Sequence, residues 1–379
     1  MPAKVLILAS VASMIDQFNI PNIKLLTEMG FAVEVACNFL VGNTCSDEKI
    51  QKLKTTLSEM KVKTYQIDFA RNAFNLRKNA TAFHQVLEIM KTNRYEFIHC
   101  HSPIGGLCGR IAGHITKTKV IYTAHGFHFY KGAPLLNWIV YYPIERFLSR
   151  YTDVLITINK EDYARAKKFH AAKVEYIPGV GIDIKKIQSA VVDKVKKRRE
   201  LGIPEDAFLF ISVGELNKNK NHEVAIRALS RIKDNEKIYY VIAGEGCLKK
   251  RLTNLIADLG MDSRVRLLGF RTDVVELLKA SDCFIFPSLR EGLPVALMEA
   301  MVVGLPIVCS NIRGNVDLVE DGVNGYLFKA LDINTLLDCL NKALNIMGEG
   351  AQTQKERMTF WDRKFVLAQM EGIYSNVHN

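Results

Sequence analysis

The feature that most constrains the fold of this chain is an alternation that continues along its whole length. Short runs in which nearly every residue is apolar are separated by longer amphipathic segments. A strand that is apolar on both faces needs helices on both sides, which is the arrangement found around a parallel sheet. The alternation therefore predicts a doubly wound α/β fold. The predicted strands are 4–9, 32–37, 62–67, 95–100, 118–123, 152–158, 174–178, 207–213, 238–243, 264–268, 282–286, 305–309 and 324–328, and the main predicted helices are 77–93, 134–150, 221–234, 247–260 and 334–347.

The length of 379 residues suggests two domains, each able to bury its own core. The break is predicted at Pro178-Gly179-Val180-Gly181, which precedes a Lys-rich stretch at 185–200 and a new series of strands. We expect a first domain over 1–179 and a second over 180–359, two Rossmann-like domains in tandem with a cleft between them. The last segment, 360–379, is predicted as a helix that could pack back on the first domain.

The positive charge is concentrated in the first half of the chain. Residues 1–180 hold 23 Lys and Arg against 14 Asp and Glu, whereas the remaining residues hold 28 against 26. This excess favours an anionic partner, whether phosphate, nucleic acid or an anionic membrane surface. The basic residues form no helix-turn-helix, zinc-finger or aromatic-basic strand signature, so nucleic-acid binding is not expected.

The cysteines and the apolar runs indicate the compartment. Eight cysteines form no C-x-x-C pair, and several lie inside predicted strands, as buried reduced thiols do in cytosolic proteins. No apolar run reaches the 18–20 residues of a spanning helix, and the first run fits a buried strand better than a signal sequence. We expect a cytoplasmic protein, with a peripheral position on the inner face of the cell membrane left open.

The segment that follows the predicted strand 282–286 has the pattern of an anion site. Pro294 suits the first turn of a helix, so the amides of Gly292, Leu293 and Val295 would face outward at its positive end. Of the flanking carboxylates, Glu291 could reach a sugar hydroxyl and Glu299 a ribose diol. The alternative is that both glutamates are ordinary helix-start charges.

Residues after three other strands of the second domain could complete such a site. Lys218 and Lys220 follow the strand 207–213 and could neutralise a diphosphate, or they could belong to a solvated loop. Gly246, in Gly244-Glu245-Gly246, would let a ligand approach the backbone. Arg271 offers an edge for a nucleobase.

Together these residues resemble family-four retaining glycosyltransferases of the GT-B fold. The resemblance is carried by the E-x7-E spacing of Glu291 and Glu299, by Lys220, by Gly244-Glu245-Gly246 and by Asp321-Gly322-Val323-Asn324-Gly325. It covers essentially the whole chain and is strongest over 207–328. The chain is similar to bacterial enzymes that build capsular, exopolysaccharide or other lipid-linked glycans.

The resemblance implies roles for the residues of the second domain. Lys220 and the helix-start amides would hold the donor diphosphate, Glu299 the ribose, and Glu291 the donor sugar near the reaction centre. The implied reaction moves a sugar from a nucleotide-diphosphate donor, UDP-linked, to a growing polyprenyl-diphosphate-linked glycan, without a cofactor. A phosphorylase or a nucleotide-sugar epimerase on the same two-domain fold is the alternative.

The sequence departs from the family pattern at two places. Glu215 stands where an arginine is usual, five residues before Lys220, so Lys218 or Arg290 would have to supply the missing charge. The Gly-Gly turn expected after the first strand is replaced by 10–13, which includes Ser13 on the expected acceptor side. No D-x-D motif occurs in the chain, so we expect cationic side chains in place of a divalent ion.

The first domain contributes histidines at two predicted strand ends. His99 and His101 share one face of a strand, but no cysteine or carboxylate lies at ligand spacing beside them, so a metal site is not favoured. His101 is expected on the acceptor side. His125, in Thr123-Ala124-His125-Gly126, matches the family loop that reaches the donor sugar, the alternative being a histidine that caps a strand end.

The aromatic stretch 135–142, flanked by Lys131, Arg146 and Arg150, is expected to be core on one side and could also rest on a membrane surface.

Overall fold

The chain forms two compact units. The computed structural model describes residues 2–43, 45–70, 75–345 and 358–378. Unit 1 comprises Met1–Val180 together with Lys364–Asn379, and unit 2 comprises Gly181–Arg363. The chain therefore leaves unit 1 once and returns to it with its last helix.

Unit 1 is built on a seven-stranded sheet with the order β3-β2-β1-β4-β5-β6-β7. All neighbouring strands in it are parallel, as the alternation predicts. The two edge strands, β3 and β7, are the exceptions to burial on both faces, since none of their residues is fully buried. The strands are β1 (Lys4–Val11), β2 (Ala32–Asn38), β3 (Lys63–Gln66), β4 (Phe97–His101), β5 (Lys119–Ala124), β6 (Val154–Thr157) and β7 (Lys173–Tyr176).

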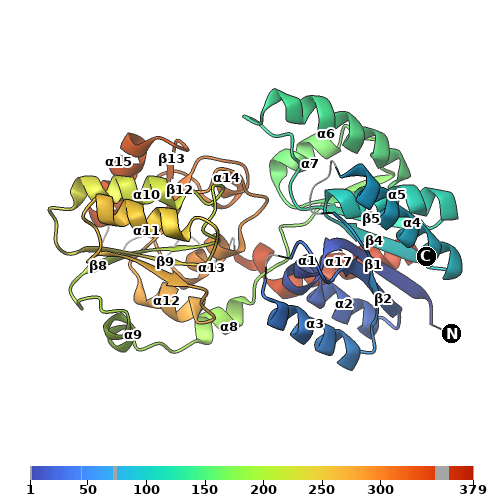
Figure 1. Cartoon of the computed structure of the whole chain (residues 1–379), viewed down its shortest axis with the longest axis horizontal. Coiled ribbons are helices and arrows are strands. Elements are labelled where there is room, and N and C mark those ends of the chain that lie inside the picture. Colours follow the sequence, from blue (N-terminus) through green and yellow to red (C-terminus); the bar gives the residue numbers. More distant parts are fainter. Residues whose placement is uncertain (1, 44, 71–74, 346–357, 379) are drawn as a thin grey trace. The chain divides into compact units, whose positions relative to one another are not determined.

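Helices cover both faces of this sheet (Figure 1). Val5 and Ile7 of β1 face one core with α1, α2 and α3, whereas Leu6 and Leu8 face the other with α4 and α5. This alternation of neighbouring side chains between two buried layers explains why the strand is apolar throughout. The helices are α1 (Ala12–Phe18), α2 (Ile20–Glu28), α3 (Asp47–Glu59), α4 (Leu76–Thr92), α5 (Pro103–Thr116), α6 (Leu135–Leu148) and α7 (Lys160–Ala166), with a 3-10 turn η1 (Ser149–Tyr151).

The last helix, α17 (Arg363–His378), packs into the core of unit 1. Its buried side chains Val366, Met370 and Tyr374 lie in the same cluster as Val5 and Ile7. The predicted segment 360–379 begins with the 3-10 turn η3 (Thr359–Trp361), and Asn379 lies outside the described residues.

Unit 2 is built on a six-stranded parallel sheet with the order β10-β9-β8-β11-β12-β13. Its strands are β8 (Phe208–Val213), β9 (Ile238–Ala243), β10 (Val265–Gly269), β11 (Cys283–Phe286), β12 (Ile307–Ser310) and β13 (Tyr326–Phe328). Its helices are α8 (Ile184–Ser189), α9 (Lys194–Glu200), α10 (His222–Leu229), α11 (Lys249–Asp258), α12 (Val274–Ala280), α13 (Val295–Val303), α14 (Asn315–Leu318) and α15 (Ile333–Asn345), with a 3-10 turn η2 (Ser230–Ile232). Both sheets confirm the predicted doubly wound α/β architecture.

The Lys-rich stretch at 185–200 is more ordered than a simple connection. It contains α8 and α9, because the side chains of Asp183 and Asp193 accept hydrogen bonds from the first-turn amides of the two helices. The guanidinium of Arg198 is buried and lies 2.5 Å from the carboxylate of Asp282. None of the helices within the described residues combines the length and the apolarity needed to span a bilayer.

Candidate functional site

The strand order of unit 2 identifies one place on its sheet for a ligand. From β8 the chain runs outward to β9 and β10, then returns to the other side of β8 with β11 and β12. The carboxyl ends of β8 and β11 therefore flank the point where the strand order reverses, which is where ligands bind in open α/β sheets. The segments after these two strands carry Lys220 and Glu291.

Lys220 and Glu291 are in direct contact. The Lys220 Nζ atom lies 2.7 Å from Oε1 of Glu291 and 4.8 Å from the ring centre of Phe286, the last residue of β11. The two side chains are only 21% and 13% exposed, so water screens the pair less than it would on an open surface. The Asn217 side chain accepts a 2.9 Å hydrogen bond from the backbone amide of Lys220. The structure thus brings together two of the predicted donor residues.

Hydrogen bonds fasten the two loops to each other. The backbone N–H of Leu289 donates to the carbonyl of Asn219 at 2.8 Å, and the Asn219 side-chain amide donates to the carbonyl of Arg290 at 2.9 Å. Asn219 is not among the site residues predicted from the sequence, although its place in the segment after β8 is a signal that could have indicated it.

A third loop, the one after β12, forms a hydrogen bond with the backbone of Glu291. The Nε–H of Arg313, a buried side chain, donates to the backbone carbonyl of Glu291 at 3.1 Å. Gly314 beside it has φ 84°, and a Cβ there would lie 2.5 Å from the carbonyl oxygen of Gly292. Only glycine fits this turn, and Arg313 is a second residue that is not among the predicted site residues.

The helix after this turn starts without a side-chain cap. Helix α13 begins at Val295, and Pro294 is its N-cap residue rather than part of the first turn as predicted. Among the described residues no side chain caps that end, so the first amides of α13 are available at the positive end of the helix. Glu299 lies about one turn further along. Burial raises the pKa of its carboxyl, an effect that the charge of Arg363 opposes.

The glycines at 244 and 246 are required by the neighbouring backbone. A Cβ at Gly244 would lie 1.9 Å from the carbonyl oxygen of Gly214, and one at Gly246 would lie 2.5 Å from that of Leu216. Backbone hydrogen bonds join the same turns, since Leu216 donates to Glu245 at 2.8 Å. These glycines therefore allow the turn after β8 and the turn after β9 to pack closely against each other.

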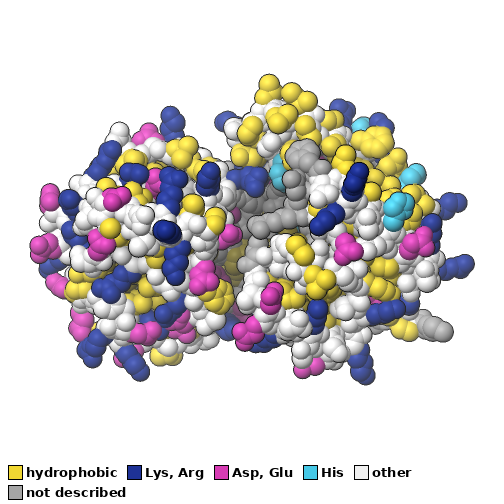
Figure 2. Space-filling model, viewed as in Figure 1, with side chains coloured by type: hydrophobic (Ala, Val, Ile, Leu, Met, Phe, Trp, Pro, Cys, Tyr) yellow, Lys and Arg dark blue, Asp and Glu magenta, His cyan; other side chains and the backbone are white. Residues whose placement is uncertain are grey.

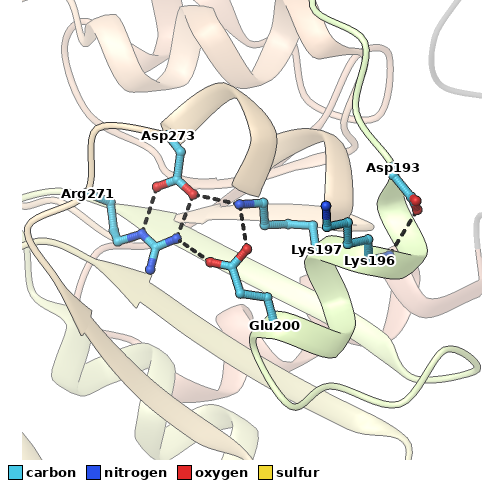
Figure 3. A network of polar contacts seen from close by, with 6 residues as sticks. All are labelled: Asp193, Lys196, Lys197, Glu200, Arg271 and Asp273. Carbon is cyan, nitrogen blue, oxygen red and sulfur yellow. Dashed lines mark hydrogen bonds and ion pairs between the residues drawn. The ribbon is translucent and has the colours of Figure 1, made fainter.

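Arg271 lies in a network of ion pairs with α9 (Figure 3). Its guanidinium is 2.6 Å from Asp273 and 3.1 Å from Glu200, and Lys197 lies 2.9 Å from each of the same carboxylates. The hydrogen bonds from Arg271 hold the pKa of Asp273 well below its ordinary value. The structure does not bring Arg271 into contact with Lys220 or Glu291. Lys218, Arg290 and Glu215 are exposed.

In unit 1 the structure brings two predicted histidines together. His101 Nδ1, at the end of β4, lies 3.0 Å from His125 Nε2, just after β5. Burial lowers the pKa of His125 to about 4 and that of His101 well below its ordinary value, so both rings are neutral near pH 7. Within the described part of the chain, His101 Nε2 is buried with no hydrogen-bond partner. Both rings line a cavity of about 20 Å³ together with Phe18 and Asn22.

A third histidine, His99, lies beside His101, with 4.1 Å between the two ring centres. Its two ring nitrogens lie 2.9 Å from the Tyr374 hydroxyl and 2.8 Å from that of Thr123, and burial lowers its pKa to about 3. Ser13 is buried near the start of α1, and its backbone amide donates to Asn43 at 3.0 Å. No group of three His, Cys, Asp or Glu side chains suited to a metal ion occurs among the residues that the structure describes.

Comparisons with known proteins identify the family. A family model described as Glycosyltransferase Family 4 matches residues 23–186, and one described as Glycosyl transferases group 1 matches residues 193–357. The putative glycosyltransferase EpsD of Bacillus subtilis is 35% identical over 339 residues, which are 88% of this chain and 85% of that relative. The UDP-Gal:alpha-D-GlcNAc-diphosphoundecaprenol alpha-1,3-galactosyltransferase of Escherichia coli is 33% identical over 293 residues, 74% of this chain and 76% of that enzyme.

Solved structures show the same fold. The crystal structure of Anabaena HepE in complex with UDP and glucose matches with a TM-score of 0.78 at 20% identity, over 99% of this chain and 100% of that one. The crystal structure of WaaG, a glycosyltransferase involved in lipopolysaccharide biosynthesis, matches with a TM-score of 0.71 at 17% identity, over 98% and 99% of the two chains. This chain belongs to glycosyltransferase family 4 and is a retaining glycosyltransferase of the GT-B fold that uses a nucleotide-sugar donor.

Proposed function

We propose that this enzyme transfers a sugar from a UDP-sugar to a growing, polyprenyl-diphosphate-linked glycan of the cell surface. The observation that carries the proposal is the contact between Lys220 and Glu291 at the point where the strand order reverses, beside the uncapped start of α13. UDP as the donor nucleotide is supported by the printed activity of the E. coli relative and by the UDP bound to HepE. A lipid-linked acceptor is supported by the diphosphoundecaprenol in the name of that same relative.

The donor diphosphate is proposed to bind at Lys220 and at the first amides of α13, near Gly292, Leu293 and Val295. The leaving group of the reaction is a diphosphate, so catalysis needs positive charge where the negative charge develops. The Lys220 ammonium and the dipole of α13 supply it without a protein nucleophile. Lys218 and Gly246 are the further proposed donor contacts, whereas the engagement of Arg271 with Asp273 and Glu200 weakens its part in the proposal.

The two glutamates are proposed to act on different parts of the donor. A diphosphate at Lys220 competes with Glu291 for the ammonium, which would free the Glu291 carboxylate to stabilise a cationic, oxocarbenium-like sugar in the transition state. Glu299, on the first turns of α13, would accept hydrogen bonds from the ribose diol. In unit 1, His125 is proposed to contact the transferred sugar, with His101 and Ser13 on the acceptor side.

The experiment is a transfer assay on the purified enzyme with UDP-, GDP- and ADP-hexoses, with and without a synthetic polyprenyl-diphosphate monosaccharide. The proposal predicts that UDP is released from a UDP-hexose and that transfer requires the lipid-linked acceptor. Proton NMR of the product would show that the anomeric configuration of the donor is kept. Release of nucleotide from none of the donors, or equal transfer to a free monosaccharide, would contradict it. Phosphate-dependent cleavage of a glycan would assign a phosphorylase reaction instead.

A further inference from the structure

Helix α6 of unit 1 turns apolar side chains outward. Five of its large apolar residues are between 40% and 74% exposed, namely Leu135, Leu136, Ile139, Ile144 and Phe147. Figure 2 shows apolar side chains gathered on the surface where α6 lies in Figure 1. A surface helix of a globular protein normally buries its apolar face and exposes its polar face to water. Helix α6 instead exposes apolar side chains.

The inward face of α6 carries its only acidic residue. Glu145 is buried and lies 2.8 Å from the guanidinium of Arg110 on α5, and the hydroxyl of Tyr122 lies 3.4 Å from its other carboxylate oxygen. Trp138 and Tyr142 pack against the buried ring of Phe129. Aromatic packing and a buried ion pair therefore fix the rotation of α6 about its own axis. Its apolar face is exposed because of this fixed orientation.

The apolar surface continues onto the end of α5. The ring of Phe147 packs edge-on against Tyr151 at 5.7 Å, and Tyr151 stacks on His114 at 4.1 Å. Ile115, which follows His114, is 49% exposed. We call the five exposed residues of α6 together with Ile115 the α6 surface.

The sequence that carries the α6 surface is basic. From residue 97 to residue 152 the sequence holds six basic residues and a single acid, Glu145, which Arg110 neutralises. The guanidinium of Arg150 lies 5.7 Å from the ring centre of Phe147. Glu161, whose carboxylate accepts from the backbone amide of Lys131, is itself paired with Arg165. The basic residues left are Lys117, Lys131, Arg146 and Arg150, since the Lys119 ammonium donates to the backbone carbonyl of Val377 on α17.

We infer that the α6 surface docks in the interfacial region of an anionic lipid bilayer, with α6 lying in the plane of the membrane. An apolar face flanked by lysine and arginine matches acyl chains bordered by anionic headgroups. A second copy of the chain fits less well, because pairing two α6 surfaces would bring like charges together with no acid to neutralise them. The inference deepens the proposed function, on which it rests, by naming the element that meets a lipid-linked acceptor.

The test is co-sedimentation of the full chain with vesicles of phosphatidylcholine alone or with one quarter phosphatidylglycerol. The wild type should bind the anionic vesicles at least tenfold more tightly than the neutral ones, and less tightly as salt is raised. A Leu136→Ser/Ile139→Ser/Phe147→Ser variant should lose at least tenfold in binding. The matched control, Val191→Ser/Val323→Ser, removes two exposed apolar side chains of unit 2 and should bind as the wild type does.

A second variant and a second measurement distinguish a loss of vesicle binding from a loss of stability or of UDP binding. Arg146→Gln/Arg150→Gln changes only exposed side chains and should lose binding to the anionic vesicles while its thermal midpoint stays unchanged. UDP affinity, measured by calorimetry without vesicles, should be the same in every variant, and its absence in the wild type would overturn the proposed function alone.

Three results would overturn docking on the bilayer. They are equal binding to both kinds of vesicle, binding to neither, and binding that survives both the apolar and the charge variants. A wild-type dimer in sedimentation velocity that the triple variant abolishes, without vesicle binding, would assign the α6 surface to a second copy instead.

Discussion

The Nζ atom of Lys220 lies 2.7 Å from Oε1 of Glu291, although 71 positions separate the two residues in the sequence. The contact joins the segment after β8 to the segment after β11, on either side of the reversal in strand order. In the proposed donor complex, the diphosphate would supply the negative charge that Glu291 supplies to Lys220 in this structure. Donor binding and the release of Glu291 towards the sugar would then be one event.

Glu291→Gln should separate sugar transfer from nucleotide binding. The amide keeps the size of the carboxylate but loses the negative charge that would stabilise a cationic transition state. We expect UDP affinity to be retained or increased, because Lys220 no longer has an anionic partner, while kcat falls at least a hundredfold. Calorimetry with UDP and steady-state kinetics measure the two effects. A matched loss of UDP affinity would place Glu291 on the nucleotide.

Gly244→Ala should damage the donor site through the backbone. Its methyl group would lie 1.9 Å from the carbonyl oxygen of Gly214, so the turn after β8 that leads to Lys220 must move. We expect a lower thermal midpoint and weaker UDP binding. The matched control is Gly372→Ala on α17, where a Cβ meets nothing within 4 Å and alanine favours the helix by up to about 1 kcal/mol. Equal behaviour of the two variants would contradict this account of Gly244.

Acidification should destabilise the enzyme in part through His222, the first residue of α10. Burial lowers the pKa of this histidine from its ordinary value of 6.5 to about 4, and the nearby charge of Lys220 adds to the shift. The unfolded chain therefore takes up a proton below pH 6.5 that the folded chain refuses, and stability falls as the pH drops from 6.5 towards 4. His222→Gln removes this term, which amounts to about 2 kcal/mol between pH 7 and pH 5. Thermal midpoints should fall less steeply with acid in the variant. Parallel slopes would show that His222 does not titrate in this way.

Glu145→Gln should destabilise unit 1 far more than a surface change of the same kind. It leaves the guanidinium of Arg110 buried without a counter-ion, which costs about 3–5 kcal/mol. Replacing both partners, as Arg110→Met/Glu145→Leu, should recover most of the loss. The control is Glu88→Gln, whose exposed pair with Lys91 contributes at most about 1 kcal/mol. Equal shifts in thermal midpoint for Glu145→Gln and Glu88→Gln would refute the role of the buried pair.

Much of the fold could be predicted because its signal is local. The run 4–9 is apolar throughout because Val5 and Ile7 face one core while Leu6 and Leu8 face the other. No helix is predicted over the Lys-rich stretch at 185–200, which contains the two short helices α8 and α9. Their N-caps, Asp183 and Asp193, stand three residues before Lys186 and Lys196, which is a pattern that can be read from the sequence.

The candidate site could be predicted only as far as strand ends identify it. Lys220 and Glu291 each follow a strand, and adjacent strands in a parallel sheet end at the same edge, so their proximity was within reach of the sequence. The support from Arg313 depends on how the turn at Gly314 packs on Gly292, which no spacing reveals. Arg271 has one partner close by in the sequence, Asp273, but its second partner, Glu200, is brought to it by the docking of α9.

The most direct test of the central claim is calorimetric titration of UDP into the wild type and into Lys220→Ala. Removal of a charge-assisted contact to the diphosphate should cost about 1.5–3 kcal/mol, roughly a 10- to 150-fold loss of affinity. The control Lys237→Ala removes an exposed lysine of unit 2 that pairs with Asp206, and should bind UDP as the wild type does. If Lys220→Ala and the wild type bind UDP with equal affinity, the donor diphosphate does not bind at the contact between Lys220 and Glu291.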